Sequence, residues 1–158
     1  MIEGVRNRDL AFDTSVLVPF VRSASGTATE EQRRTGQAYS PAEMSSLRGI
    51  VREARSCKML PYVLAETSNL VSQKAAKEVR RAALQALVAD WLDAEVKSED
   101  VVRSPDFTEF GAADAALLIW LRQGTERAAI TEDAKLWAIA AYGGLPMINF
   151  SHYRDVSA

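Results

Sequence analysis

Short apolar segments alternate with longer segments of helical periodicity along this chain of 158 residues. We expect strands at 10–12, 58–60, 127–131 and 146–150, with a weaker candidate at 101–102. We expect helices from 41 and from 61, and over 75–92, 111–120 and 134–142. This alternation is typical of an α/β domain with a largely parallel sheet of strands covered by helices on both faces.

The stretch between the first two expected strands is the least regular part of the chain. Residues 23–40 are rich in Ser, Thr, Gly, Gln and Glu and lack an apolar face, so we expect a loop or a loosely held insertion there. The helix that follows has a clear start, because Ser40, Pro41 and Glu43 form an N-cap, a first-turn proline and a capping box. We predict a single domain over 1–158 with an insertion of loop and helix at about 23–57.

Composition excludes several classes of chemistry. The single Cys57 rules out an intramolecular disulfide and a cysteine-based zinc site, and the single His152 rules out histidine-pair chemistry. No apolar run approaches the roughly 20 residues of a membrane span, and the N-terminus has no signal-peptide pattern. We therefore expect a cytoplasmic protein without membrane association, whose chemistry depends on carboxylates, hydroxyls and basic side chains.

Charge is unevenly distributed along a chain whose net charge is only −2. Residues 22–58 hold seven basic side chains and four acids, whereas 90–114 holds eight acids and two basic side chains. Lys74, Lys77 and Arg81 recur at helical spacing and form a candidate stripe for RNA phosphates, although a solvated basic face is the commoner meaning of such a pattern.

Four acids occupy positions that we expect to converge. Asp13 directly follows the first strand and Asp133 follows the strand at 127–131, so both lie at the carboxyl edge of a parallel sheet, where α/β proteins bind ligands. Glu66 lies on the apolar stripe of the helix that begins at 61, and Asp114 lies on the apolar stripe of the helix at 111–120. An unpaired carboxylate is unfavourable at such a position.

Each of these acids also has a purely structural interpretation. Asp13 and Asp133 could cap the helices that follow them, Asp114 could complement a helix dipole, and Glu66 could pair with a buried arginine. If instead they meet, two carboxylates about 4 Å apart repel by roughly 4 kcal/mol, so a counter-charge is needed. Hard oxygen ligands select Mg²⁺ or Mn²⁺, which suit displacement at phosphorus.

The segments that carry these acids resemble the motifs of PIN-domain ribonucleases, and most of all the toxins of VapBC-type (VapC-type) toxin–antitoxin systems. The resemblance rests on 12–18, 63–70, 111–118 and 130–136, in the family's order, and extends to the closing segment 144–150. It implies a three-layer α/β sandwich with a parallel sheet of four or five strands. It also implies Mg²⁺- or Mn²⁺-dependent cleavage of single-stranded RNA.

The resemblance also implies roles for individual residues. The catalytic acids would be Asp13, Glu66, Asp114 and Asp133. Of these, Asp13, Asp114 and Asp133 would hold metal, and Glu66 would position or deprotonate the attacking water. Three hydroxyls would support them, with Thr131 orienting the Asp133 loop and Thr14 or Ser15 reaching the phosphate. Glu132 lies beside Asp133, and the T-x-D spacing favours Asp133 as the ligand.

The expected partners are an RNA substrate, single-stranded or structured, and a cognate antitoxin, with a homodimer also possible. Three alternatives stay open. The chain could be a PIN-like module that binds RNA or protein without cutting, or an RNA-processing nuclease outside a toxin system. A haloacid-dehalogenase-like phosphatase is disfavoured, because it requires D-x-D-x-T where this chain has Asp13 followed by Thr14 and Ser15.

Overall fold

A computed structural model describes residues 4–73 and 76–154. Its centre is a five-stranded sheet in the order β3-β2-β1-β4-β5, in which every pair of neighbouring strands is parallel. The strands are β1 (Asp9–Phe12), β2 (Ser56–Met59), β3 (Leu92–Asp93), β4 (Arg127–Thr131) and β5 (Met147–Asn149). This architecture confirms the predicted α/β class and the predicted parallel sheet.

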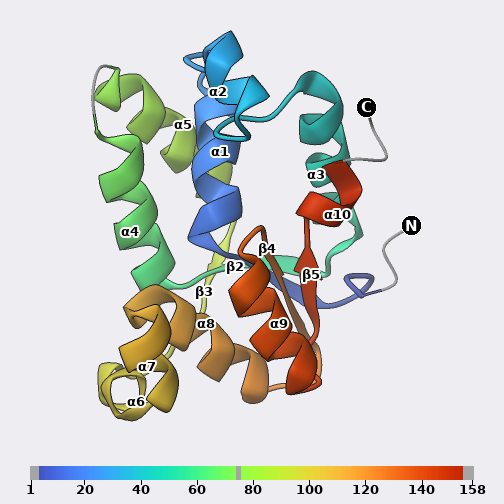
Figure 1. Cartoon of the computed structure of the whole chain (residues 1–158), viewed down its shortest axis with the longest axis vertical. Coiled ribbons are helices and arrows are strands. Elements are labelled where there is room, and N and C mark those ends of the chain that lie inside the picture. The colour runs from blue at the N-terminus through green and yellow to red at the C-terminus, as the bar shows by residue number, and fades with distance from the viewer. Residues whose placement is uncertain (1–3, 74–75, 155–158) are drawn as a thin grey trace.

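Ten helices flank this sheet in the described part of the chain, as in a three-layer α/β sandwich (Figure 1). Between β1 and β2 lie α1 (Thr14–Ala24), α2 (Glu30–Arg34) and α3 (Pro41–Glu53). The others are α4 (Pro61–Val71), α5 (Lys77–Val88), α6 (Ser98–Arg103), α7 (Pro105–Phe110), α8 (Ala112–Arg122), α9 (Ala134–Tyr142) and α10 (Ser151–Arg154). Of these described helices, none is long and apolar enough to cross a bilayer.

The order of the strands decides where a site can form. The chain runs outward from β1 through β2 to β3, then returns to place β4 on the other side of β1. β1 and β4 are therefore hydrogen-bonded neighbours, with Phe12 level with Ile130. Because connections leave these two strands in opposite directions, a crevice opens at their carboxyl ends, and Asp13 and Asp133 follow those ends.

The apolar core explains why the central elements are so regular. Leu10, Ala11 and Ile130 are fully buried, as expected for strands covered on both faces. Helix α8 buries most of its side chains, including Leu117 and Leu118, because it is apolar around most of its circumference.

The helix after the irregular stretch begins as predicted. At α3, the Ser40 hydroxyl accepts a hydrogen bond from the amide of Glu43, and the Glu43 carboxylate accepts one from the amide of Ser40. The strand at 127–131 and the helix at 134–142 also have the predicted bounds.

Three local predictions are wrong. Residues 101–102 belong to helix α6 rather than to a strand. The edge strand of the sheet is instead β3 (Leu92–Asp93), at the end of the helix that was expected over 75–92. Both residues of this edge strand are exposed, so no alternation marks it. The stretch 23–40 is largely irregular, as predicted, apart from the short helix α2, but it is not loosely held, because Ala38 and Tyr39 are buried. Of the basic stripe, Lys77 and Arg81 are exposed, and Lys74 lies outside the described residues.

Candidate active site

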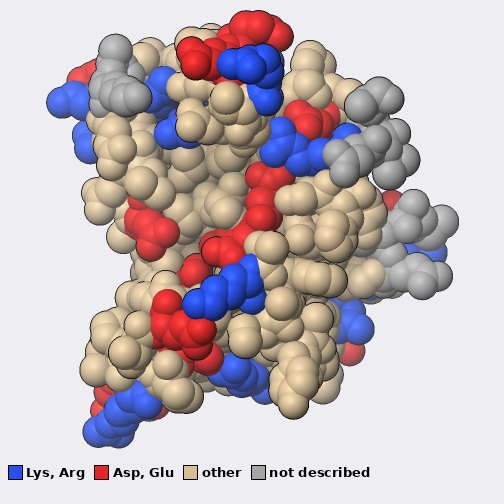
Figure 2. All heavy atoms as spheres, viewed as in Figure 1, with Lys and Arg blue, Asp and Glu red and all other residues tan. Residues whose placement is uncertain are grey.

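The four predicted acids come from four separate segments and line one pocket of about 420 Å³. Asp13 and Asp133 follow β1 and β4, Glu66 lies on α4, and Asp114 lies in the first turn of α8. Helix α4 packs against both α1 and α8, which brings these segments together. On the face shown in Figure 2, acidic side chains form a band along a hollow between the α4 side and the α9 side.

Asp13 is buried, and its side chain is bound by hydroxyls of the neighbouring strand and of α1 rather than by the helix amides that a cap would bind. It occupies the N-cap position of α1, yet its carboxylate makes no capping hydrogen bond. Its Oδ2 instead accepts hydrogen bonds from the hydroxyls of Thr131, at 2.7 Å, and Ser15. These contacts exclude the capping interpretation of Asp13 and hold the carboxylate at the carboxyl edge of the sheet.

Thr131 links the two acids of the sheet edge. Its hydroxyl donates to Asp13 and accepts a hydrogen bond of 2.9 Å from the amide of Asp133. Asp133 does cap α9, because its Oδ1 accepts from the amides of Lys135 and Leu136. The structural interpretation of Asp133 is therefore confirmed, while the same side chain also lines the pocket.

Glu132 is held by contacts away from its neighbour Asp133. Its carboxylate accepts hydrogen bonds from Arg154, at 3.0 Å, and from the Tyr39 hydroxyl, at 3.1 Å. Arg154 also donates to Glu43 at 2.6 Å, which ties α10 to α3. Glu132 is not among the residues that line the acid pocket, so of the two adjacent acids only Asp133 faces it.

Asp114 is the acid whose titration the pocket changes most. Burial raises its pKa to about 8, with further contributions from the charge of Asp13, a hydrogen bond between these two carboxyl groups, and the charges of Glu66 and Asp133. A first-turn position on α8 alone would favour the ionised form, because the helix dipole is positive there. Burial, together with the surrounding carboxylates, outweighs the effect of the dipole on the pKa of Asp114.

Glu66 differs from its prediction in one respect. The sequence placed it on a core-facing stripe, but the buried positions of α4 are Val63, Thr67 and Val71, and Glu66 is exposed. The expected pairing with a buried arginine is also absent, since no ion pair of Glu66 occurs among the described residues. Glu66 nevertheless lines the acid pocket from the α4 side.

The donor set of the pocket suits a hard divalent cation, but the ligands are not assembled into a finished centre. Over 4–73 and 76–154, no three His, Cys, Asp or Glu side chains form a cluster ready to hold a metal ion. One oxygen of Asp133 is bound by helix amides, and one oxygen of Asp13 by hydroxyls. Asp13 and Asp114 do meet, and a cation beside them would favour ionised Asp114. The metal-binding assignment of Asp13, Asp114 and Asp133 stays a prediction.

The two candidate hydroxyls of α1 have different environments. Ser15 donates to Asp13 and accepts a hydrogen bond of 2.9 Å from the amide of Glu132, so its hydroxyl is engaged in positioning. The hydroxyl of Thr14 is buried beside the pocket and has no hydrogen-bond partner among the described residues. The geometry therefore assigns Ser15 to the support of Asp13 rather than to contact with a phosphate.

Sequence reasoning missed two functional candidates, Arg22 and Arg154. Arg22 lines the acid pocket from the end of α1, and Arg154 holds Glu132. For Arg22 a signal was present, because it follows Ser15 by seven residues and Val18 by four, which places all three on one helical face. No comparable signal existed for Arg154, whose partners lie in distant segments.

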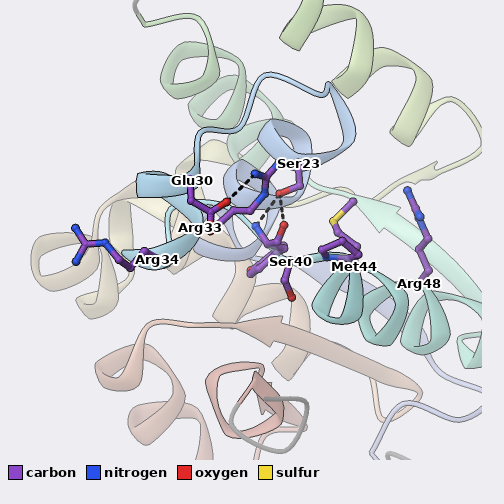
Figure 3. A pocket seen from close by; sticks show the side chains of 9 residues that line it. Ser23, Glu30, Arg33, Arg34, Ser40, Met44 and Arg48 are labelled. Atoms are coloured by element: carbon purple, nitrogen blue, oxygen red, sulfur yellow. Dashed lines mark hydrogen bonds and ion pairs between the residues drawn. The ribbon is translucent and has the colours of Figure 1, made fainter.

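A second hollow, of about 850 Å³, lies beside α2 and the start of α3 and is lined partly by arginines. Figure 3 shows that these arginines do not converge, since Arg33 is paired with Glu30, Arg34 points away from the hollow and Arg48 lies at its far side. The hollow therefore lacks the gathered charge of the acid pocket, which is the stronger candidate for an active site.

Comparison with known proteins adds no further assignment: no protein-family model and no curated protein matches this chain.

Proposed function

We propose that this protein is a divalent-cation-dependent endoribonuclease of the PIN-domain type that cleaves single-stranded RNA. The observation that carries the proposal is the convergence of Asp13, Glu66, Asp114 and Asp133 on one pocket, with the pKa of Asp114 raised by burial and by the other three carboxylates. Clustered carboxylates repel one another, so a fold that gathers them is expected to use a cation there.

The residues have distinct tasks in this proposal. Asp13, Asp114 and Asp133 would hold Mg²⁺ or Mn²⁺, and the cation would supply an acidified water and charge stabilisation at the phosphate. Thr131 and Ser15 keep the Asp13 carboxylate oriented. Glu66, exposed on α4 at the wall of the same pocket, is suited to orient or deprotonate the attacking water.

The decisive experiment is a titration of Mg²⁺ and Mn²⁺ with labelled RNA oligonucleotides. We expect cleavage that requires the cation and is lost in Asp114→Asn. The matched control is Asp100→Asn, since Asp100 is also a first-turn acid but lies exposed on α6. Wild-type protein that leaves RNA intact at every cation concentration would contradict the proposal, as would an Asp114→Asn variant of full activity.

The toxin role, which the sequence resemblance suggests, is the finer part of the proposal. We expect expression of the chain alone to arrest growth and co-expression of a cognate antitoxin to restore it. Cation-dependent cleavage without growth arrest would favour an RNA-processing nuclease instead. RNA binding without cleavage would favour the catalytically inactive binding module.

A further inference from the structure

The acid pocket has a basic end. Helix α1 contributes Ser15, Val18, Pro19 and Arg22 to its lining. Ser15 stands beside Asp13, and Arg22 lies seven residues further on, which is roughly 10 Å along the helix axis. The pocket therefore runs from the four carboxylates at one end to a guanidinium at the other.

Arg22 is half-buried and incompletely paired. One of its terminal nitrogens donates to the carbonyl of Gln37 at 3.3 Å. Its Nε is buried without a hydrogen-bond partner among the described residues. No carboxylate within residues 4–73 and 76–154 forms an ion pair with Arg22. A buried donor without a partner is unfavourable, and the only hydrogen bond of this guanidinium among the described residues goes to a neutral carbonyl. Its positive charge is therefore not compensated within the described residues.

A second arginine reinforces the positive charge at this end. Arg80, on α5, is only 8% exposed and donates to the Thr27 hydroxyl, at 2.9 Å, and to the carbonyl of Gln73. It too lacks an ion pair within the described residues. Burial, and then the nearby charge of Arg80, lower the pKa of Arg22. A half-buried and a buried guanidinium, close enough to repel each other and bonded only to neutral groups among the described residues, favour the binding of an anion.

We propose that Arg22, reinforced by Arg80, binds a phosphate of the RNA strand adjacent to the phosphate that is cut at the acidic end of the pocket. This inference rests on the proposed function and adds to it the means by which the strand is held. A nucleic-acid strand carries phosphates in succession, so one ligand reaches both ends of the pocket. The planar guanidinium presents several donors to phosphate oxygens, which suits this contact.

The test measures binding rather than cleavage. Asp114→Asn serves as the background, so that RNA stays intact, and the affinity for a fluorescent single-stranded RNA is measured by anisotropy over a series of salt concentrations in Mg²⁺. Adding Arg22→Gln is expected to weaken binding about tenfold at low salt. It is also expected to reduce the slope of log K against log salt by about 0.7, the value for one phosphate contact on a single strand.

Two further variants separate a phosphate contact from a general effect. Arg34→Gln removes an exposed arginine that points away from the second hollow, the one beside α2 and α3. This variant is expected to leave the RNA affinity and the salt slope almost unchanged. Arg22→Lys keeps the charge and is expected to recover part of the affinity and all of the slope. Melting temperatures check that each variant is folded.

The outcomes distinguish the two proposals. Unchanged affinity and slope in Arg22→Gln would overturn the phosphate contact, even if the wild type cuts RNA. Failure of the background protein to bind RNA would overturn it as well. A protein that binds RNA through Arg22 but never cuts it would leave the contact standing and remove the nuclease. If Arg22→Gln weakened binding of an oligoglutamate peptide but not of RNA, the arginine would serve a protein partner and the phosphate contact would be wrong.

Discussion

Thr131 donates a hydrogen bond of 2.7 Å to Asp13 across 118 positions of the chain. The same hydroxyl accepts from the amide of Asp133, so one side chain sets the positions of two acids of the pocket. The contact exists because β1 and β4 are neighbours in the sheet. The position of Thr131 at the end of β4 therefore fixes how Asp13 and Asp133 lie relative to each other.

Replacing Thr131 with valine tests this link. We expect Thr131→Val to lower the free energy of unfolding by about 1–3 kcal/mol, because it removes a donor to a buried carboxylate and leaves the Asp133 amide without its acceptor. Denaturant unfolding measures the change. Thr67→Val is the matched control, since Thr67 is also fully buried but its hydroxyl has no partner among the described residues. It is expected to be neutral or stabilising, and equal effects of the two substitutions would contradict the role given to Thr131.

The raised pKa of Asp114 predicts a pH dependence of stability in the absence of divalent cations. The folded protein holds this proton up to about pH 8, whereas the unfolded chain releases it near pH 4. Between these values the folded state binds more protons, so the free energy of unfolding falls as the pH rises. In EDTA, Asp114→Asn is expected to flatten this decline and to melt at or above the wild-type temperature at neutral pH.

Asp100→Asn is the control for the pH series and is expected to keep the wild-type slope. A clearly lower melting temperature for Asp114→Asn at neutral pH would mean that the Asp114 carboxylate stabilises the fold, as a cap or an ion pair would.

The different environments of the adjacent acids Glu132 and Asp133 predict different effects on RNA cleavage. Asp133→Asn keeps a good helix cap but removes a charge from the pocket, and we expect it to reduce the cleavage rate about a hundredfold or more. Glu132→Gln, outside the pocket, is expected to keep the rate within a few-fold of wild type. Cleavage assays on both proteins at saturating Mg²⁺ decide the matter, and the reverse order of effects would assign the site to Glu132.

The contact between α10 and α3 predicts that α10 contributes to the free energy of unfolding. Arg154→Met is expected to lower the free energy of unfolding by about 2–3 kcal/mol, because Glu132 and Glu43 would both lose their cation while largely buried. Arg33→Met breaks an exposed pair with Glu30 and is expected to cost less than about 1 kcal/mol. Chemical unfolding of both variants measures the difference. Similar losses would show that the Arg154 contacts act as an ordinary surface pair.

The success of the sequence predictions follows the strength of the local signals. The strand at 127–131 and the helix at 134–142 were predicted with their observed bounds, because buried periodicity and a helix cap mark them. Strand β3 was missed because it is a two-residue exposed edge, defined by its pairing with β2 rather than by its own pattern. Helix α6 carries Glu99 and Asp100 in its first turn, a start signal that outweighs the β preference of Val101 and Val102.

The sequence by itself determined the α/β class, the positions of the main buried strands and helices, and the identity of four candidate acids. These follow from local rules, since periodicity records which face of an element is buried and the end of a strand marks where a ligand site can form. Only the tertiary structure decided that Tyr39 and Arg154 hold Glu132 outside the pocket, that Ser15 supports Asp13, and that Arg22 stands at the opposite end. Each of these outcomes depends on partners that distant segments bring close, and no local pattern encodes such a partner.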